Sequence, residues 1–314
     1  MPAMKGVLNK IVLTLVIGAS MGFWGCGGGK TTPFPWQSTV PEFSHVILLV
    51  EENQAYATII GNPAMPYLNS LAEKYGLATN YFANAHPSIS DYFMLTTGDL
   101  VTNDDGFSGT VTSDNIVREL LKAGRTWKSY AETLPSVGYT GGSQYPYVKH
   151  HNPFAYFSDV VENDTQRSNL VPFSQFAQDL AAGQLPNYSF IVPDQYHNMH
   201  DCPEGMSTCT NVDKLAAADA WLVTNIGPLV DSSTFQEDSL LLIVFDESEM
   251  EDLANGGGHV ALLVISHKAK HGTKSTTFYQ HQSTLRLTVD ALRLNGFPGA
   301  SATASSPGEF FTPQ

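Results

Sequence analysis

Positively charged side chains are scarce in this chain. Its 314 residues include 16 Lys and Arg against 30 Asp and Glu, which gives a formal net charge of -14 at pH 7. Without a basic patch, a protein cannot release counterions from nucleic-acid phosphates, so non-specific binding of DNA or RNA is excluded as a function. If the substrate is an anion, positive charge has to come from elsewhere, and a bound metal ion would supply it.

Cysteine is also scarce, and the first of the three cysteines, Cys26, ends a sequence that is typical of an export signal. A positively charged stretch precedes a mostly apolar segment over residues 11–24, which is short for a membrane span. The Gly25-Cys26 pair resembles a bacterial lipoprotein processing site, so we expect residues 1–26 to be a signal with a lipid-anchored cysteine. Plain cleavage and an uncleaved anchor are the alternatives. In each case we expect a periplasmic, cell-surface or secreted protein.

The other two cysteines, Cys202 and Cys209, bracket a short loop. In an exported protein such a pair is typical of a disulfide, whereas two free thiols or a soft-metal site are the alternatives. We predict the disulfide.

Charged residues make up only 15% of the chain and hydrophobic residues 42%, which is ample for a core. Unbroken apolar runs predict strands buried on both faces, as in a parallel sheet covered by helices. The predicted strands cover residues 45–50, 78–82, 127–130, 188–192, 239–245 and 259–266. The predicted helices cover residues 65–75, 92–97, 113–123 (with Ser113 as N-cap), 173–182, 213–226 and 281–294. This alternation predicts a single α/β domain with a mostly parallel central sheet flanked by helices.

The expected domain boundaries follow from composition. Residues 27–43 are rich in Gly, Thr and Pro and are predicted to form a flexible tether. The globular domain is expected over residues 44–300 and a tail over residues 301–314. Within the domain, residues 133–172 are dense in Tyr, Pro, His and Phe, which predicts a pocket-forming insertion.

Acidic residues and histidines follow three of the predicted strands. These residues are Glu52 and Asn53, then Asp194 with His197 and His200, and finally Asp246 and Glu247. Because ligands bind outside the carboxyl ends of parallel strands, we expect the three sets to converge at one edge of the sheet. Oxygen and imidazole ligands together favour a divalent metal ion. Helix caps or surface ion pairs are the alternative for any single member.

Ser88 lies in a polar turn ahead of an apolar stretch that should open a helix. Backbone N–H groups at a helix start can hold an anion. A serine hydroxyl bound to a metal ion loses its proton readily and becomes a nucleophile. Ser88 is therefore the candidate nucleophile, and an ordinary N-cap is the alternative.

A series of short motifs follows in order between residues 44 and 296. They are VEEN at 50–53 with Tyr56, HPS at 86–88 with Asp91-Tyr92 and Thr97-Gly98, WKSYAE at 127–132, KHHNPF at 149–154, YSFIVP at 188–193, MHD at 199–201, DAWL at 219–222, VFDE at 244–247, and YQH at 279–281 with STLR at 283–286. The series resembles the bacterial and fungal phosphoesterase family. That family contains acid phosphatases and bacterial phospholipases C and belongs to the alkaline-phosphatase superfamily.

The resemblance implies a role for individual residues. The implied metal ligands are Glu52, Asn53, Asp246, Glu247 and, in the place of a late histidine ligand, His259. Ser88 matches the nucleophile that forms a phosphoenzyme. The implied phosphate ligands, or acids that protonate the leaving group, are His151, His200 and His281. The neighbours of the nucleophile in its motif, His86 and Asp91, are the expected substrate-binding residues.

The chain departs from the family pattern in two places. Asp91 stands where the family usually has Asn, and a carboxylate cannot donate to a phosphate oxygen unless it is protonated. Asp91 would then bind a metal ion or weaken phosphate binding. His197-Asn198 stands where the family commonly has Asn-Asp. An expected ligand is thus an amide, which leaves the number of metal ions, one or two, open.

These residues predict a metal-dependent phosphomonoesterase of the acid-phosphatase type that acts through a phosphoserine. Its expected substrates are small-molecule or lipid phosphoesters, including phosphoinositides, and contact with a membrane is expected only through the N-terminal anchor. A phospholipase C-type phosphodiesterase is one alternative, although we expect nothing after residue 300 to form the added C-terminal domain of those relatives. A non-catalytic surface lipoprotein that binds a phosphorylated ligand is the other.

Overall fold

The computed structural model describes residues 39–312. The predicted signal, the lipidation site at Cys26 and most of the predicted tether lie outside the described residues. Among these residues, nine strands form one sheet in the order β4-β3-β5-β1-β6-β7-β2-β8, with β9 paired to β2. The strands are β1 (His45–Glu51), β2 (Gly76–Phe82), β3 (Trp127–Ala131), β4 (Leu170–Pro172), β5 (Tyr188–Val192), β6 (Ser239–Phe245), β7 (His259–Ile265), β8 (Lys274–Ser275) and β9 (Tyr279–Gln280).

Strand β1 lies at the centre of the sheet and pairs in parallel with β5 on one side and β6 on the other. Within the described sheet, β7 alone runs antiparallel to its neighbours β6 and β2. Every residue of β6 is buried, as its unbroken apolar sequence predicts for a strand covered on both faces. The mostly parallel sheet is therefore confirmed.

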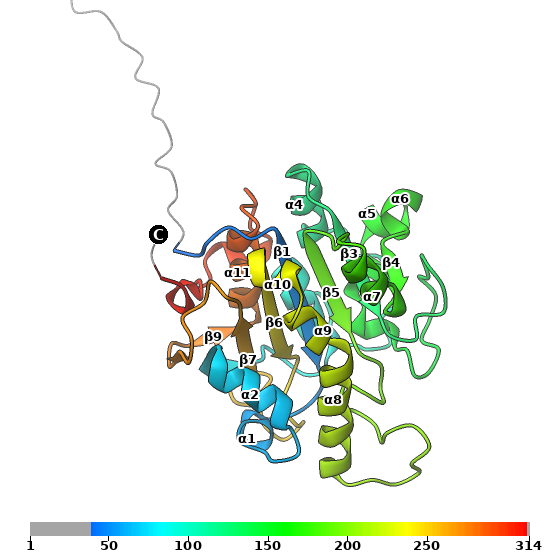
Figure 1. The fold of residues 1–314 in the computed structure, drawn as a ribbon. Helices are drawn as coiled ribbons and strands as arrows, with labels where there is room; N and C mark the ends of the chain where they lie inside the picture. Colours follow the sequence, from blue (N-terminus) through cyan, green and yellow to red (C-terminus); the bar gives the residue numbers. More distant parts are fainter. Residues whose placement is uncertain (1–38, 313–314) are drawn as a thin grey trace, which may run out of the picture. The chain divides into compact units, whose positions relative to one another are not determined.

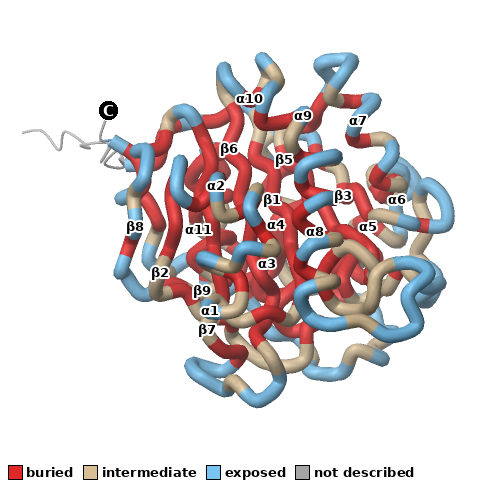
Figure 2. The backbone as a smooth tube through the Cα atoms, turned by 60° about the horizontal axis from the view of Figure 1, so that its bottom comes forward, coloured by how far each residue is buried: buried red, intermediate tan, exposed pale blue. Residues whose placement is uncertain are grey.

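Helices cover both faces of this sheet. They are α1 (Tyr56–Ile59), α2 (Pro66–Lys74), α3 (Ile89–Thr97), α4 (Ile116–Lys122), α5 (Ser158–Val161), α6 (Asp164–Arg167), α7 (Ser174–Ala181), α8 (Asn211–Asn225), α9 (Gly227–Val230), α10 (Ser233–Asp238) and α11 (His281–Ala291). In Figure 1, α2, α8 and α9 lie in front of the strands, and α11 lies behind them. Helix α3 packs against α11, on the face opposite α8. Figure 2 shows the buried segments running through the strands between these layers.

The start of helix α4 differs from the prediction. Asn115, and not Ser113, is its N-cap, and its side chain accepts hydrogen bonds from the N–H groups of Val117 and Arg118. Asn and Ser both cap helices well, so sequence alone could not choose between two candidates two residues apart.

The packed domain extends beyond the predicted boundaries of residues 44 and 300. Val40 and Phe43, from the predicted tether, are buried, as are Phe310 and Phe311 from the predicted tail. The rings of Phe43 and Phe311 lie 5.7 Å apart between centroids, so the two ends of the described chain pack together. Apolar side chains in a Pro- and Gly-rich context have no periodicity that would have revealed this burial.

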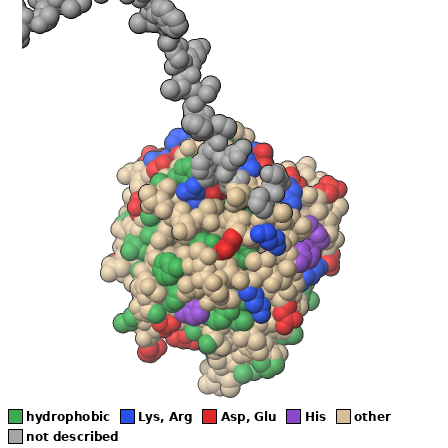
Figure 3. Space-filling model, turned by 90° about the vertical axis from the view of Figure 1, so that its left-hand side faces the viewer, with side chains coloured by type: hydrophobic (Ala, Val, Ile, Leu, Met, Phe, Trp, Pro, Cys, Tyr) green, Lys and Arg blue, Asp and Glu red, His purple; other side chains and the backbone are tan. Residues whose placement is uncertain are grey.

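Cys202 and Cys209 form the predicted disulfide, with their Cα atoms 5.5 Å apart. On the face drawn in Figure 3, basic side chains are spread among polar atoms and do not gather in one patch. Among residues 39–312, no helix has both the length and the apolar character needed to cross a bilayer.

Candidate functional site

Ser88 lies at the carboxyl edge of the sheet, immediately before α3. Its Oγ is 3.0 Å from Oε1 of Glu247, 3.3 Å from Oε2 of Glu52 and 3.5 Å from Oδ1 of Asn53. Glu52 and Asn53 follow β1, and Glu247 follows β6, so the first and third predicted sets do converge on Ser88. A hydroxyl has one hydrogen and can donate to only one of these three oxygens.

Asp246 completes this group of oxygen ligands. Its Oδ1 accepts a hydrogen bond of 3.0 Å from the backbone N–H of Asn53, whereas its Oδ2 is buried without a hydrogen-bond partner among the described residues. A buried carboxylate oxygen is costly unless it is paired or binds a metal ion. This unpartnered oxygen and the oxygen-only donor set next to Ser88 fit a divalent cation.

The pKa values of these acids are raised. Burial and then the charge of Glu247 raise the pKa of Asp246 to about 7. Burial also raises the pKa of Glu247 to about 7 and that of Glu52 well above its ordinary value. Two like charges 4 Å apart repel by about 4 kcal/mol at an effective dielectric constant of 20. A cation among these oxygens would offset the repulsion and favour the ionised carboxylates.

His86 holds Glu247 in place. Its Nδ1 lies 2.6 Å from Oε2 of Glu247, and its Nε2 lies 3.0 Å from the backbone carbonyl of Asp252. We expected His86 to bind substrate, but both ring nitrogens are used within the protein. The structure therefore gives His86 a positioning role, because it fixes the carboxylate that contacts Ser88.

His281 also has a different place from the one we expected. It is fully buried, with Nδ1 2.8 Å from the hydroxyl of Tyr81 and Nε2 against the backbone carbonyl of Asp246. Burial lowers the pKa of His281 to about 4, so the ring is neutral. Both ring nitrogens of His281 are thus bonded inside the protein, and the ring contacts the end of β6.

Asp91 is buried next to His281, and its Oδ1 lies 3.3 Å from Nε2 of that residue. The same oxygen accepts a hydrogen bond of 2.8 Å from the N–H of Asn84. Burial raises the pKa of Asp91 well above its ordinary value. A protonated Asp91 can donate a hydrogen bond as an amide does, which reconciles it with the Asn of the family pattern.

His151 lies against the ligand group from the other side. Its Nε2 is 3.3 Å from Oε1 of Glu52, and its ring stacks on Tyr92, whose hydroxyl donates to the same carboxylate oxygen. Its Nδ1 is buried without a partner among the described residues. Burial, followed by the charges of His150 and His200, lowers the pKa of His151 well below its ordinary value.

His200 lines a cavity of about 300 Å³ that opens next to Asn53. Its Nδ1 is 2.8 Å from Oδ1 of Asp201, and its backbone carbonyl accepts a hydrogen bond from Lys214. Gln54, Met199, Asn211 and Glu249 complete the lining. His200 therefore lies where a group bound beside the predicted metal ligands would be in reach.

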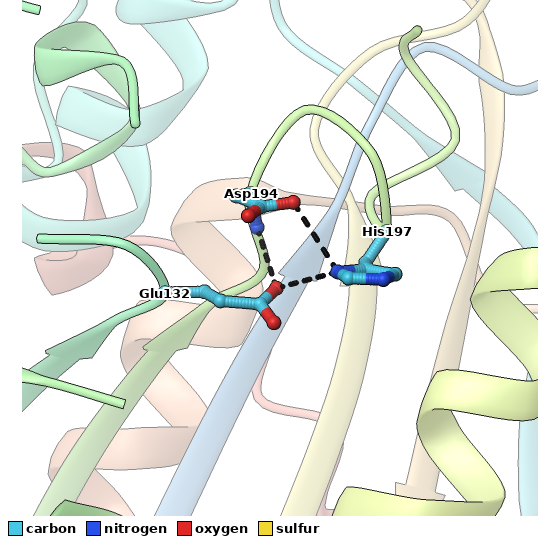
Figure 4. A group of neighbouring side chains, drawn as sticks. All are labelled: Glu132, Asp194 and His197. Carbon is cyan, nitrogen blue, oxygen red and sulfur yellow. Dashed lines mark hydrogen bonds and ion pairs between the residues drawn. The ribbon is translucent and has the colours of Figure 1, made fainter. Parts of the chain in front are cut away.

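His259 and two members of the second predicted set, Asp194 and His197, have partners other than Ser88. The His259 ring stacks on Tyr56 and Phe82, and its Nε2 is 3.1 Å from the carbonyl of Thr79. This geometry gives no support to the predicted metal ligation by His259. From the second set, Asp194 and His197 are turned toward Glu132, as Figure 4 shows.

Sequence reasoning missed two residues that support the site. Tyr81 bonds His281, as described above, from an extended segment that carried no chemical signal. Asp105 accepts a hydrogen bond of 3.2 Å from the N–H of Ile89, at the start of α3. Asp105 belongs to a polar turn, and nothing in such a turn indicates that it folds back onto the helix after Ser88.

Comparison with known families and proteins shows that the chain is similar to phosphoesterases. The model of the Phosphoesterase family matches residues 62–293. A probable acid phosphatase of Kluyveromyces lactis is 31% identical over 252 residues, which cover 77% of this chain and 56% of the relative. A phosphatidylinositol-3-phosphatase of Mycobacterium tuberculosis is 35% identical over 215 residues, which cover 68% of this chain and 66% of the relative. The chain thus spans between about half and two thirds of the length of these curated relatives.

Solved structures agree on the fold. A protein in the alkaline phosphatase superfamily from Vibrio parahaemolyticus superimposes with a TM-score of 0.62 at 14% identity, covering 86% of this chain and 72% of that chain. The lipoteichoic acid synthase LtaP from Listeria monocytogenes superimposes with a TM-score of 0.59 at 11% identity, covering 85% and 76%. At this identity, the similarity concerns the fold alone.

Proposed function

Because this chain belongs to the Phosphoesterase family, we propose that it is a metal-dependent phosphomonoesterase that hydrolyses phosphate esters through a phosphoserine at Ser88. The observation that carries the proposal is the position of the Ser88 hydroxyl, 3.0 to 3.5 Å from oxygens of Glu247, Glu52 and Asn53. The unpartnered Oδ2 of Asp246 is the second support. Acidic residues alone would repel a phosphate, so this arrangement needs a cation.

Glu52, Asn53, Asp246 and Glu247 would hold that cation, with the Ser88 oxygen as a further ligand. A divalent ion at this position supplies positive charge for the phosphate and favours the ionised serine oxygen. Whether one ion or two are bound is a separate question, which metal analysis answers. The Asn at position 198, where the family commonly has Asp, leaves this number open.

The residues of the chain then perform two displacements. Ser88 Oγ attacks the phosphorus atom in line, and its proton passes to a neighbouring carboxylate, of which Glu247 is the nearest. The bond between phosphorus and the leaving oxygen breaks, and the alcohol takes a proton from a histidine. His200 is the proposed donor because it lines the cavity next to Asn53. Water then attacks the phosphoserine and passes a proton to the neutral His200, while the leaving Ser88 oxygen takes back its proton from Glu247, which releases phosphate and restores the starting state.

The proposed substrates are phosphate monoesters of small molecules or lipids. Two relatives support this choice, because their names are acid phosphatase and phosphatidylinositol-3-phosphatase. The cavity beside Asn53 also contains Lys214, whose ammonium group donates to the carbonyl of His200. A cationic side chain at this place would favour an anionic headgroup.

The test is hydrolysis of p-nitrophenyl phosphate by the purified chain, before and after removal of divalent metals with a chelator. We expect chelation to abolish turnover and a divalent metal salt to restore it. Turnover that survives complete removal of metal would contradict the proposal. The choline diester of p-nitrophenyl phosphate, assayed beside the monoester, distinguishes a phosphodiesterase, since a monoesterase should prefer the monoester by at least about tenfold.

We also propose that the protein is exported and anchored by a lipid at Cys26. The support is the sequence pattern of residues 1–26 alone. Fractionation of cells that express the chain tests the idea: the parent should partition with membranes, and Cys26→Ser should not. Equal partition of the two proteins would contradict lipid anchoring.

A further inference from the structure

Glu132, Asp194 and His197 form a cluster of ligand-type side chains that the proposed reaction does not use. The His197 Nδ1 atom lies 3.0 Å from Oε2 of Glu132 and 3.2 Å from Oδ1 of Asp194. One ligand atom from each residue lies within 4.8 Å of the other two. Figure 4 shows the three side chains turned toward one another from the ends of β3 and β5. Two carboxylates and an imidazole are a donor set that transition-metal ions accept.

Glu51, the last residue of β1, is close to this cluster, and no contact within the described protein accounts for its buried carboxyl group. It is completely buried, and neither carboxylate oxygen has a hydrogen-bond partner among the described residues. Protonation alone does not resolve this, because a neutral carboxyl group still carries an O–H that needs an acceptor. A buried carboxyl group with both oxygens unpartnered therefore indicates a missing ligand.

The strand register directs Glu51 toward the cluster. In the sheet, Leu49 pairs with Ile191, and Val192 pairs with Ala131. Continuing both registers by one or two residues brings Glu51 and Glu132 level with each other, on the two sides of β5. Level residues of parallel strands share a face of the sheet, so both acids point to the same side. The charges of Glu132 and His197 act on the Glu51 carboxyl group, in agreement with this direction.

We propose that Glu132, Asp194 and His197 bind a divalent transition-metal ion, with Glu51 as an additional carboxylate beneath it, at a site distinct from that of Ser88. Consecutive residues of a strand point to opposite faces, so Glu51 belongs to this site and Glu52 to the Ser88 site. The ion replaces a proton: Nδ1 of His197 must lose its hydrogen before it can bind the metal.

The surroundings of the cluster suit a metal site. The Trp221 indole N–H donates to Oε1 of Glu132 at 3.0 Å, and the backbone N–H of Tyr196 donates to Oδ1 of Asp194 at 3.0 Å. Such hydrogen bonds orient metal ligands. A surface depression of about 510 Å³ over Glu132, His197 and Trp221 gives an ion a route of entry.

An ion at this position would link the ends of three strands, β1, β3 and β5, because its ligands lie at the end of each of them. It would also fix the start of the segment that runs from Asp194 to His200. The proposed site thus lies across the sheet from Ser88 and supports the histidine on the substrate side. The competing interpretation is an ion triad in which a protonated His197 alone neutralises the two carboxylates.

Zn²⁺ binding to the full chain separates the two interpretations. The chain is stripped with a chelator, dialysed against Zn²⁺ at pH 7.5, and its bound metal is measured by mass spectrometry of the element. Asp246→Asn disables the Ser88 site. We expect Asp246→Asn to retain one bound Zn²⁺. In the double variant Asp246→Asn/His197→Gln, the affinity of this site for Zn²⁺ should be at least about tenfold weaker, so that the ion is lost on dialysis. His267→Gln is the matched control. His267 is exposed and lies next to His271, away from the cluster, so this substitution should leave the amount of bound Zn²⁺ unchanged.

Anomalous diffraction from Zn²⁺-loaded crystals of Asp246→Asn would locate the bound ion directly. We expect a peak among Glu132, Asp194 and His197. Circular dichroism of each variant checks that the fold is intact. Failure of Asp246→Asn to bind Zn²⁺, or equal binding with and without His197→Gln, would overturn the proposal and establish the protonated triad. Neither result depends on phosphatase activity, so the function proposed above is tested independently.

Discussion

The Ser88 hydroxyl lies 3.0 Å from Oε1 of Glu247, although 159 residues separate them in the chain. The two residues meet because β1 and β6 are parallel neighbours that end at the same edge of the sheet, where α3 also begins. His86 fixes the other oxygen of Glu247 through a 2.6 Å contact. The serine, its carboxylate and the residue that orients the carboxylate thus form one connected unit, whose parts have different expected responses to substitution.

Replacing Ser88 with Ala should remove the nucleophile and leave the acids in place. We expect hydrolysis of p-nitrophenyl phosphate to fall by about a thousandfold or more, which corresponds to about 4 kcal/mol in the barrier, with metal still bound. Steady-state kinetics and metal analysis measure the two effects. Ser90→Ala is the matched control, because Ser90 is buried in the same helix and its hydroxyl donates to the carbonyl of Thr102. Activity close to that of the parent in Ser88→Ala would contradict the phosphoserine route.

Replacing His86 with Ala should loosen Glu247 without removing a predicted ligand. Residues that orient metal ligands typically contribute about 10 to 100-fold to metal affinity. We therefore expect activity at limiting metal to drop by about that factor and to recover largely at high metal concentration. A metal titration of the rate is the measurement. A loss that no metal concentration restores would show that His86 contacts the reacting phosphate, as its sequence position first suggested.

Replacing Asp91 with Asn should be nearly neutral for turnover. The buried carboxyl group has a raised pKa, and its Oδ1 accepts from the N–H of Asn84 and lies near Nε2 of His281, a role that the amide oxygen of Asn can keep. We expect kcat/KM within about threefold of the parent. Asp91→Leu, which fills the space but cannot form hydrogen bonds, should destabilise the protein by about 1–3 kcal/mol. A large loss of bound metal in Asp91→Asn would instead identify Asp91 as a ligand.

Asp179 gives a prediction about stability and pH, away from the site. Burial alone would raise the pKa of Asp179, but hydrogen bonds from Lys128, Tyr130 and Gln175 hold it below its ordinary value. A depressed folded pKa adds stability that is present above the unfolded pKa near 4 and is lost as pH falls through the folded value. Asp179→Asn should therefore cost about 1–3 kcal/mol at pH 7 and less toward pH 3. Denaturant unfolding at both pH values measures this, and a pH-independent difference would refute it.

The sequence predicted the central strands because each is a short, mostly apolar run. Predicted strands at 45–50, 188–192, 239–245 and 259–266 correspond to β1, β5, β6 and β7. Strands β8 and β9 have two residues each and were not predicted. Such short strands are formed by their neighbours and have no periodicity of their own.

The site was predictable to the extent that strand order brings acids to one edge. Glu52, Asn53, Asp246 and Glu247 meet near Ser88 for that reason. The role of each histidine was less predictable, because it depends on what the second ring nitrogen contacts. His281 bonds Tyr81 and the Asp246 carbonyl, and His86 bonds Glu247 and the Asp252 carbonyl. Those partners are far apart in sequence, and a motif does not reveal them.

A crystal structure of the chain with a divalent metal ion and a phosphate analogue such as vanadate would show whether the acids and Ser88 act together. We expect an ion within about 2.0–2.6 Å of oxygens from Glu52, Asn53, Asp246 and Glu247. We also expect Ser88 Oγ to lie between that ion and the vanadium atom. An ion bound away from these acids, or vanadate bound out of reach of Ser88, would contradict the proposed phosphoserine mechanism.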